Sequence, residues 1–192
     1  EDVARRDFTI NGMFYDPLTE QVIDYVQGRA DLDRRIIRTI GDPQERFGED
    51  YLRMLRAIRF STQLGFAIDP DTYAAVQRNA AHIVRISGER IALELEGILA
   101  HPNRARGAAM LLETGLAAAI FPGFAGAGAE EAVGVLSRLR RQVSFPLALA
   151  AFYAGFPTAF ARESLEILKL SRKHLRHVEF LLAQRGRLLA SG

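Results

Sequence analysis

The pattern of the sequence changes once along its 192 residues, near residue 41. Before that point, apolar and polar residues alternate from Asp7 to Tyr15, and the turn-forming stretch 16–19 leads into segment 21–25, which predicts a β-hairpin. Residues 36–40 contain three isoleucines and fit a further strand. After residue 43 the apolar residues recur with helical spacing. The sequence therefore predicts a mainly α fold that begins with a short β-hairpin.

Residues typical of helix ends divide the helical part. Glycine favours the position just after a helix, whereas Ser, Asp and Asn favour the position just before one. The predicted stops are Gly65, Gly115 and Gly155, and the predicted N-caps are Asp69, Ser87, Asn103 and Ser171.

So small a hairpin cannot bury its own face. We therefore expect the chain to be a fragment whose preceding segment completes the sheet.

Composition excludes several classes of protein. Hydrophobic residues make up 48% and charged residues 25% of the chain, which is typical of a globular fold and not of a disordered chain. The chain has no cysteine, which excludes disulfides, a thiol nucleophile and a cysteine zinc site. No apolar run reaches the roughly 20 residues that span a membrane, so we expect no membrane association and a cytoplasmic location.

The basic residues are almost all arginine. Arginine accounts for 23 of the 25, the exceptions being Lys169 and Lys173, while the net charge is only +2. A guanidinium suits phosphates and base edges, although a GC-rich genome produces the same bias. The arginines also cluster, which favours an anionic partner. Two of these clusters are Arg138-Arg140-Arg141 and Arg172-Lys173-Arg176, the second on a predicted basic helix that continues through Arg185 and Arg187.

The first candidate site lies in the stretch Arg5 to Met13. Two arginines precede a predicted strand that places Asp7 and Asn11 on one face. Such a strand offers a phosphate-binding Arg6 beside a ribose-binding Asn11. The alternative is an ordinary ion pair between Arg6 and Asp7 at a strand end.

The second candidate site lies in the stretch Glu49 to Phe60. At about 100° per residue, Asp50, Arg53 and Arg56 fall on one side of a predicted helix, opposite its apolar side. An Asp accepts from the exocyclic amine of adenine or cytosine while an Arg donates to the neighbouring ring nitrogen, and guanine and uracil invert that pattern. The alternative is an i,i+3 ion pair with no binding role.

These stretches, taken in order and spacing, resemble the class II nucleotidyltransferases, that is, bacterial tRNA CCA-adding enzymes and bacterial poly(A) polymerases. The resemblance is specific over about residues 1–100 and general beyond them. Gly12 stands where the family usually has Ala. The motifs that carry the resemblance are R-R-D-F-T-I-N-G-M, D-Y-V-Q-G-R-A-D-L from Asp24, E-D-Y-L-R-M-L-R-A-I-R-F from Glu49, and Glu89-Arg90-Ile91 with Glu94.

The resemblance implies roles for individual residues. Arg6 would contact the triphosphate, Asn11 the ribose, and Asp50 with Arg53 the incoming base. Arg90 and Glu94 would brace the helices. The implied nucleotide-binding set is Arg6, Asp7, Asn11, Asp50, Arg53 and Arg56, with structural support from Asp31, Arg90 and Glu94.

The family's Asp-x-Asp pair after a glycine-rich turn, which holds Mg²⁺ for phosphoryl transfer, has no counterpart in the sequence. The pairs Asp31/Asp33 and Asp69/Asp71 do not follow such a turn. We therefore expect Mg²⁺ to be bound outside this fragment, no metal or catalytic residue within it, and no activity of the fragment alone.

The resemblance also implies three parts and an RNA partner. Residues 1–40 would be the C-terminal end of the nucleotidyltransferase head, 41–115 a helical neck and 116–192 a helical, RNA-binding body. The candidate RNA-binding residues are Arg138, Arg140, Arg141, Arg172, Lys173 and Arg176. His174 and His177 share the last helix with these cations, which disfavour a metal site there.

The implied function is template-independent addition of nucleotides to an RNA 3′ end. CCA addition to tRNA from CTP and ATP is the first hypothesis, and poly(A) polymerase is the second. A hypothesis of another class is a helical RNA-binding module without chemistry, whose RNA affinity would not depend on ATP or CTP.

Overall fold

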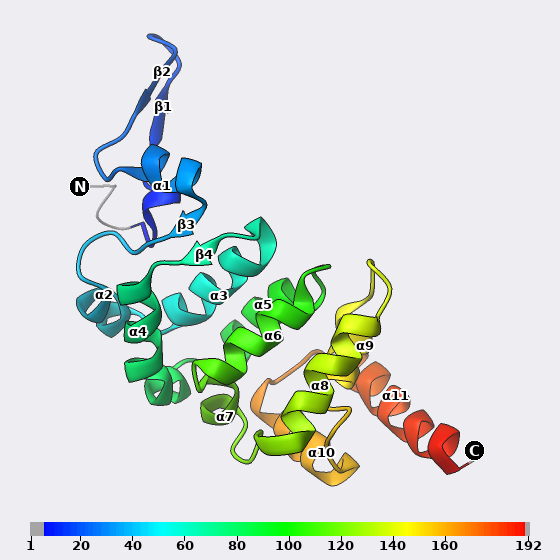
Figure 1. Ribbon diagram of the computed structural model, residues 1–192. Coiled ribbons are helices and arrows are strands. Elements are labelled where there is room, and N and C mark those ends of the chain that lie inside the picture. Colours follow the sequence, from blue (N-terminus) through cyan, green and yellow to red (C-terminus); the bar gives the residue numbers. More distant parts are fainter. Residues whose placement is uncertain (1–5, 191–192) are drawn as a thin grey trace.

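The computed structural model describes residues 6–190, with side chains described as far as residue 184. The short strands lie within the first 68 residues, interspersed with helices, and the described chain beyond them is helical, which confirms the predicted mainly α fold (Figure 1). In chain order the elements are η2 (Thr9–Asn11), β1 (Phe14–Asp16), β2 (Gln21–Ile23), α1 (Gly28–Arg34), β3 (Ile36–Ile37), α2 (Pro43–Glu49), α3 (Leu52–Leu64), β4 (Ala67–Ile68), α4 (Pro70–Asn79), η3 (Ala80–Arg85), α5 (Gly88–Leu99), α6 (Arg104–Glu113), α7 (Leu116–Ile120), α8 (Gly126–Arg138), α9 (Phe145–Phe152), α10 (Thr158–Ile167) and α11 (Arg172–Ala190).

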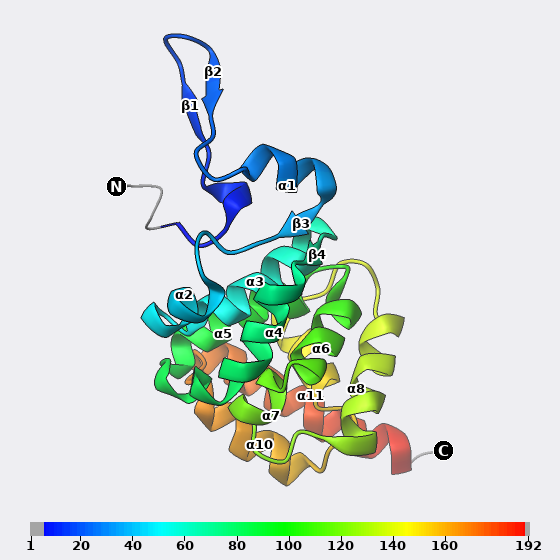
Figure 2. The ribbon, with the colours of Figure 1, turned by 60° about the vertical axis from the view of Figure 1, so that its left-hand side comes forward.

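The predicted hairpin is confirmed, but it starts later than expected. Strands β1 and β2 pair antiparallel, with Tyr15 opposite Val22, and the hairpin projects away from the helices (Figure 2). The strand predicted from Asp7 is wrong, because residues 9–11 form the 3-10 turn η2. In that turn the Asn11 side chain accepts from the Phe8 amide at 3.1 Å, which folds the chain back on itself. Polar and apolar residues therefore do not separate onto two faces, and Asp7, Phe8 and Thr9 are all buried.

A second, minimal sheet connects the first 40 residues to the helices. Strand β3 pairs parallel with β4, with Ile36 opposite Ala67 and Ile37 opposite Ile68. The strand predicted for residues 36–40 is thus present but ends at Ile37. Phe8 forms an isolated antiparallel bridge with Thr39. Its ring packs edge-on against that of Phe60 in α3, with the ring centroids 5.6 Å apart.

Several predicted helix ends are confirmed. Gly65 follows α3 with φ of 70°, and Gly115 lies between α6 and α7 with φ of 79°, conformations that favour glycine. Asp69 caps α4 by accepting from the Thr72 amide, and Ser171 accepts from the His174 amide at the start of α11. Ser87 and Asn103 hold N-cap positions without a side-chain capping bond.

Gly155 serves a different purpose from the predicted one. Helix α9 ends three residues earlier, at Phe152, so Gly155 is not its stop. A Cβ at Gly155 would lie 2.1 Å from the carbonyl oxygen of Gly128, so the residue allows a close backbone approach to α8.

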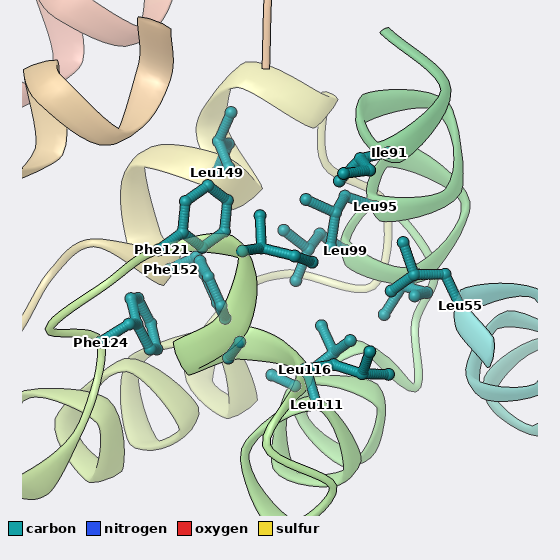
Figure 3. Close-up of a cluster of buried hydrophobic side chains, with 14 of the residues drawn as sticks. Leu55, Ile91, Leu95, Leu99, Leu111, Leu116, Phe121, Phe124, Leu149 and Phe152 are labelled. Carbon is teal, nitrogen blue, oxygen red and sulfur yellow. The ribbon is translucent and has the colours of Figure 1, made fainter. Parts of the chain in front are cut away.

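One hydrophobic core extends from Phe47 to Leu182. Figure 3 shows side chains of α3, α5, α6, α7 and α9 converging on it, among them Leu55, Leu95 and Phe152. Phe124 stacks on Phe152 with ring centroids 4.3 Å apart. Leu111 and Leu116 belong to the same core, so the helices on both sides of residue 115 are packed together. The boundaries at residues 40 and 115 stay predictions.

Among the described residues, no helix combines the length and apolar character that crossing a membrane requires.

Candidate nucleotide-binding pocket

A polar cavity of about 460 Å³ lies where the segment before β1 meets the start of α3 and the first turn of α5. We call it the polar pocket. Its volume falls in the range of small-molecule sites. All six residues predicted to bind nucleotide line it, together with Leu52 and Arg90. The lining residues are Arg6, Asp7, Asn11, Asp50, Leu52, Arg53, Arg56 and Arg90.

Asp50 lies at the start of α3, not on its face as predicted. Its backbone is extended, with φ of −153°, because it ends α2 before α3 begins at Leu52. One carboxylate oxygen accepts from the Leu52 amide at 3.1 Å, and the other accepts from Arg90 Nη2 at 2.7 Å. A carboxylate accepts about four hydrogen bonds, so these two contacts orient Asp50 and leave acceptor positions in the pocket.

Arg53 is held from two sides by acids. Its Nε donates to Asp7 Oδ1 at 2.9 Å, and its Nη1 donates to Glu49 Oε2 at 2.5 Å. Burial opposes the charged form, but the hydrogen bonds with Glu49 and Asp7 outweigh it and raise the pKa of Arg53. Within the described part of the chain, Nη2 makes no hydrogen bond, so it remains a donor. The alternative ion pair between Arg53 and Asp50 is not formed.

Asp7 holds two of the four arginines that line the pocket, Arg53 and Arg56. Its second oxygen accepts from Arg56 Nε at 2.5 Å, and its side chain is only 12% exposed. Asp7 was predicted on the polar face of a strand, in contact with nucleotide. The strand is not formed, but Asp7 lines the pocket, and its two oxygens hold Arg53 and Arg56, which lie 46 and 49 residues further along the chain. Its contact with nucleotide stays a prediction.

Helix α5 contacts the pocket residues through the side chains of Arg90 and Glu94. Glu94 is buried, accepts from Arg59 Nε at 2.6 Å, and lies 3.9 Å from Arg56 Nη1. Arg90 and Glu94 therefore both connect α5 to the segment that carries the pocket arginines. Arg59 and Glu49 had no predicted role. The i,i+3 spacing of Arg56 and Arg59, and the i,i+4 spacing of Glu49 and Arg53, were the available signals.

Arg6 and Asn11 form the wall nearest the hairpin. Arg6 Nη1 donates to the Asn11 carbonyl at 3.1 Å, and its guanidinium lies 5.0 Å from the centre of the Phe14 ring. The Asn11 side-chain oxygen is engaged by the Phe8 amide, as described above, so its NH₂ group is the part suited to a ligand hydroxyl.

Asp31 lies outside the polar pocket. It is buried, accepts from Thr9 Oγ1 at 2.7 Å and pairs with Arg38 at 3.1 Å, while Arg38 also pairs with Asp69 at 2.7 Å. Asp33 and Asp71 are exposed. Neither Asp-x-Asp pair therefore turns two carboxylates toward one point. In the described ranges there is no group of three or more His, Cys, Asp or Glu residues that could hold a metal ion.

The candidate RNA-binding residues lie on the helical body and are exposed. Among residues with described side chains, no carboxylate pairs with any of them. The side chains of Arg185 and Arg187 lie outside the description. We call the exposed set the basic surface: Arg138, Arg140 and Arg141 at the end of α8 and just after it, and Arg172, Lys173 and Arg176 on the first turns of α11.

Comparison with known proteins places this geometry in a family. Residues 1–38 match the family described as "Poly A polymerase head domain", and residues 65–127 match "Probable RNA and SrmB-binding site of polymerase A". The CCA-adding enzyme of Anoxybacillus flavithermus is 40% identical over 178 residues, which are 93% of this chain and 44% of that protein.

Solved structures agree. The Bacillus stearothermophilus CCA-adding enzyme in complex with CTP matches with a TM-score of 0.83 at 37% identity, covering 97% of this chain and 47% of that one. The Thermotoga maritima CCA-adding enzyme complexed with tRNA matches with a TM-score of 0.75 at 26% identity, covering 99% and 50%.

The chain spans less than half the length of the curated relatives it matches. The motifs around the polar pocket are those that carry the resemblance. The chain belongs to the class II nucleotidyltransferase family of bacterial CCA-adding enzymes and poly(A) polymerases.

Proposed function

We propose that this chain is the nucleotide-selecting and RNA-holding portion of a template-independent tRNA nucleotidyltransferase that uses CTP and ATP. The observation that carries the proposal is that Asp50 and Arg53 both line the polar pocket without forming an ion pair with each other. Each is oriented by other charged groups, yet each keeps hydrogen-bonding capacity toward the cavity.

The chemistry of these two side chains selects bases. An oriented carboxylate accepts from the exocyclic amine of cytosine or adenine, and an oriented guanidinium donates to the adjacent ring nitrogen. Guanine and uracil present a carbonyl to the carboxylate and an N–H to the guanidinium. Each unmade buried hydrogen bond costs about 1–3 kcal/mol, so two mismatches disfavour GTP and UTP strongly.

The remaining pocket residues fit the rest of a nucleotide. Arg6 supplies a forked cation for phosphate oxygens, and the Asn11 amide donates to a ribose hydroxyl. Arg56 lies beside Arg53 on the same acid, Asp7, and adds positive charge.

The exposed basic surface supports an RNA partner. Its six cations pair with no carboxylate of the described side chains, and such charge suits a phosphate backbone. The solved complex of the Thermotoga maritima CCA-adding enzyme with tRNA supports a tRNA 3′ end as the proposed acceptor. We propose the cytoplasm as the location.

The described residues do not fit a Mg²⁺ site, because they lack a cluster of metal-ligating side chains. We therefore assign no step of phosphoryl transfer to this chain. Magnesium belongs to this proposal only through the family, and its ligands are expected outside the residues described.

The proposal is tested by measuring the affinity of the chain for each of the four nucleoside triphosphates by titration calorimetry. CTP and ATP are expected to bind at least about tenfold more tightly than GTP and UTP. Binding of ATP with rejection of CTP would favour the poly(A) polymerase alternative. RNA binding with no nucleotide affinity would favour a non-catalytic module.

A further inference from the structure

Among the described side chains, the largest that is fully buried is a cation, Arg104. It is the first residue of α6 and is 2% exposed. Burial lowers its pKa. In the part of the chain that the structure describes, no carboxylate pairs with it. A buried guanidinium without an acid is costly unless neutral acceptors satisfy its donors.

Four main-chain carbonyls satisfy Arg104. At the end of α5, the carbonyl of Leu99 accepts from Nε at 2.9 Å and that of Ala100 from Nη2 at 3.4 Å. In the loop between α8 and α9, the carbonyl of Arg140 accepts from Nη1 at 3.1 Å and that of Arg141 from Nη2 at 2.8 Å.

These hydrogen bonds decide how the loop presents its side chains. The carbonyls of Arg140 and Arg141 are held by the buried guanidinium, while the side chains of both residues are exposed. Arg138, at the end of α8, is exposed beside them. Three exposed cations within four residues repel one another, so the loop needs an anchor to keep them together.

Only a guanidinium serves as this anchor. Its five N–H groups leave in fixed directions within one plane and reach four carbonyls from two separate segments of the chain. A lysine at this position is a point charge with three donors, and reaches fewer of the four oxygens.

We infer that Arg104 is a positioning residue that presents the loop 138–141 as a phosphate-binding element for RNA. The RNA half of this inference rests on the proposed function, whereas the positioning half does not. Arg104 itself does not contact the RNA.

The positioning half is tested with trypsin, which cleaves the peptide bond at the carbonyl of an arginine. Those carbonyls at Arg140 and Arg141 are the ones that Arg104 holds. In the parent chain, cleavage after Arg138 should precede cleavage after Arg140 and Arg141. In Arg104→Lys, cleavage after Arg140 and Arg141 should accelerate by about tenfold, because local opening exposes the bonds.

Arg106→Lys is the matched control. Arg106 lies on the same helix and also donates to a carbonyl, that of Phe66 at 2.8 Å, but it has no hydrogen bond to the loop. Its cleavage pattern should match that of the parent. The parent measurement needs no variant, so the inference stays testable if Arg104→Lys does not fold, as judged by circular dichroism.

The RNA half is tested by the affinity for a tRNA transcript without its terminal CCA, measured at several salt concentrations. Arg104→Lys should lower the log–log salt slope by roughly 0.7 to 0.9 for each phosphate that the loop no longer neutralises. In a background where Arg138, Arg140 and Arg141 are all Gln, Arg104→Lys should have no further effect, since the loop then carries no cations.

The outcomes of these experiments test the positioning role of Arg104 and the RNA-binding role of the loop separately. Equal cleavage rates in the parent at all three arginines, or unchanged rates in Arg104→Lys, overturn the positioning role whatever the chain binds. Faster cleavage with an unchanged salt slope, or an equal effect of Arg104→Lys in both backgrounds, overturns the RNA role of the loop. A parent chain that does not bind the tRNA overturns the RNA part of the proposed function, while the cleavage pattern still decides the positioning half.

Discussion

The polar pocket and the basic surface are both rich in arginine, but they hold it differently. In the pocket, Arg53 and Arg56 share Asp7, and Glu49 and Glu94 add further acids. On the basic surface, no acid pairs with the cations among the described side chains. Pairing with an acid fixes the orientation of a guanidinium but lowers the net positive charge of the site. An arginine without an acid adds its full charge to the surface, but its side chain is not held in one orientation.

This difference matches two kinds of recognition. Distinguishing a base edge requires donors and acceptors at fixed positions, and a guanidinium gripped by carboxylates supplies them. Binding a phosphate backbone requires positive charge over a surface, and it weakens as salt rises. Nucleotide binding at the pocket should therefore depend on geometry, and RNA binding at the surface on charge.

The largest expected effect separates binding from catalysis. We expect the 192-residue chain to bind nucleotide and tRNA but to transfer no nucleotide, because two-metal chemistry needs ligands that its described residues do not provide. Incubation with Mg²⁺, labelled CTP or ATP and a tRNA transcript checks this. Extension of the RNA 3′ end by the purified chain would show that the chain catalyses transfer as well as binding, and would contradict this expectation.

Asp7→Asn should break the pocket most severely. Removal of the carboxylate charge leaves Arg53 and Arg56 without the acid they share, in a site where Arg53 is only 12% exposed. We expect the free energy of unfolding, measured with urea, to fall by about 2–3 kcal/mol. Asp33→Asn, at an exposed position, is the control and should change it by less than about 0.5 kcal/mol. Equal small changes for both variants would mean that the pocket arginines do not need Asp7.

Much of the architecture was predictable, since it depends on local signals. The hairpin, the glycine after α3 and the Asp69 cap each follow from residues within one turn of one another. The contacts that build the pocket were not predictable from spacing. Asp7 meets Arg53 across 46 residues, and Glu94 meets Arg59 across 35. Local sequence patterns carry no information on contacts between residues so far apart in the chain, so the role of Asp7 in holding Arg53 and Arg56 was missed.

Element boundaries account for the other errors. Placing Asp50 on the helix face required α3 to begin two residues earlier than it does. The predicted strand at Asp7 failed because Asn11 bonds its side chain to the Phe8 amide, a local choice that alternation does not reveal. The candidate set still converged on one cavity, since the motifs mark residues by chemistry as well as by position.

The basic surface should respond to salt and not to geometry. Replacing Arg172, Lys173 and Arg176 together with Gln should reduce the salt slope of tRNA binding by roughly 0.7 to 0.9 for each phosphate that these cations neutralise in the parent, with nucleotide affinity unchanged. Fluorescence anisotropy at several salt concentrations measures the slope. If the slope of the triple variant equals that of the parent, α11 is a solvated helix face and the RNA contacts the loop after α8 instead.

The smallest expected effect is a pH dependence confined to the pocket. The hydrogen bond from Arg53, with a second from Arg46, lowers the pKa of Glu49 below its usual value of 4.5. The stabilisation that the ionised Glu49 gives to the pocket is therefore fully present above pH 4.5. It is lost as the pH falls through the lower pKa that Glu49 has in the folded state. Nucleotide affinity should weaken slightly over that acidic range, and Glu49→Gln should remove this dependence while tRNA binding stays the same. A matching loss of tRNA affinity would indicate general acid unfolding.

The proposed selection of the base by Asp50 and Arg53 is tested by calorimetry on an Asp50 variant and a matched control. The affinities of CTP, ATP, GTP and UTP are measured for the parent, for Asp50→Ala and for Asp42→Ala, which removes a different helix-capping aspartate outside the pocket. Asp50→Ala should reduce CTP and ATP affinity by about tenfold or more while GTP and UTP affinity stays equal or rises, because the carboxylate both attracts the amine and repels the carbonyl. Asp42→Ala should preserve the preference. A loss by the same factor for all four nucleotides in Asp50→Ala would contradict the account and make Asp50 a structural cap of α3.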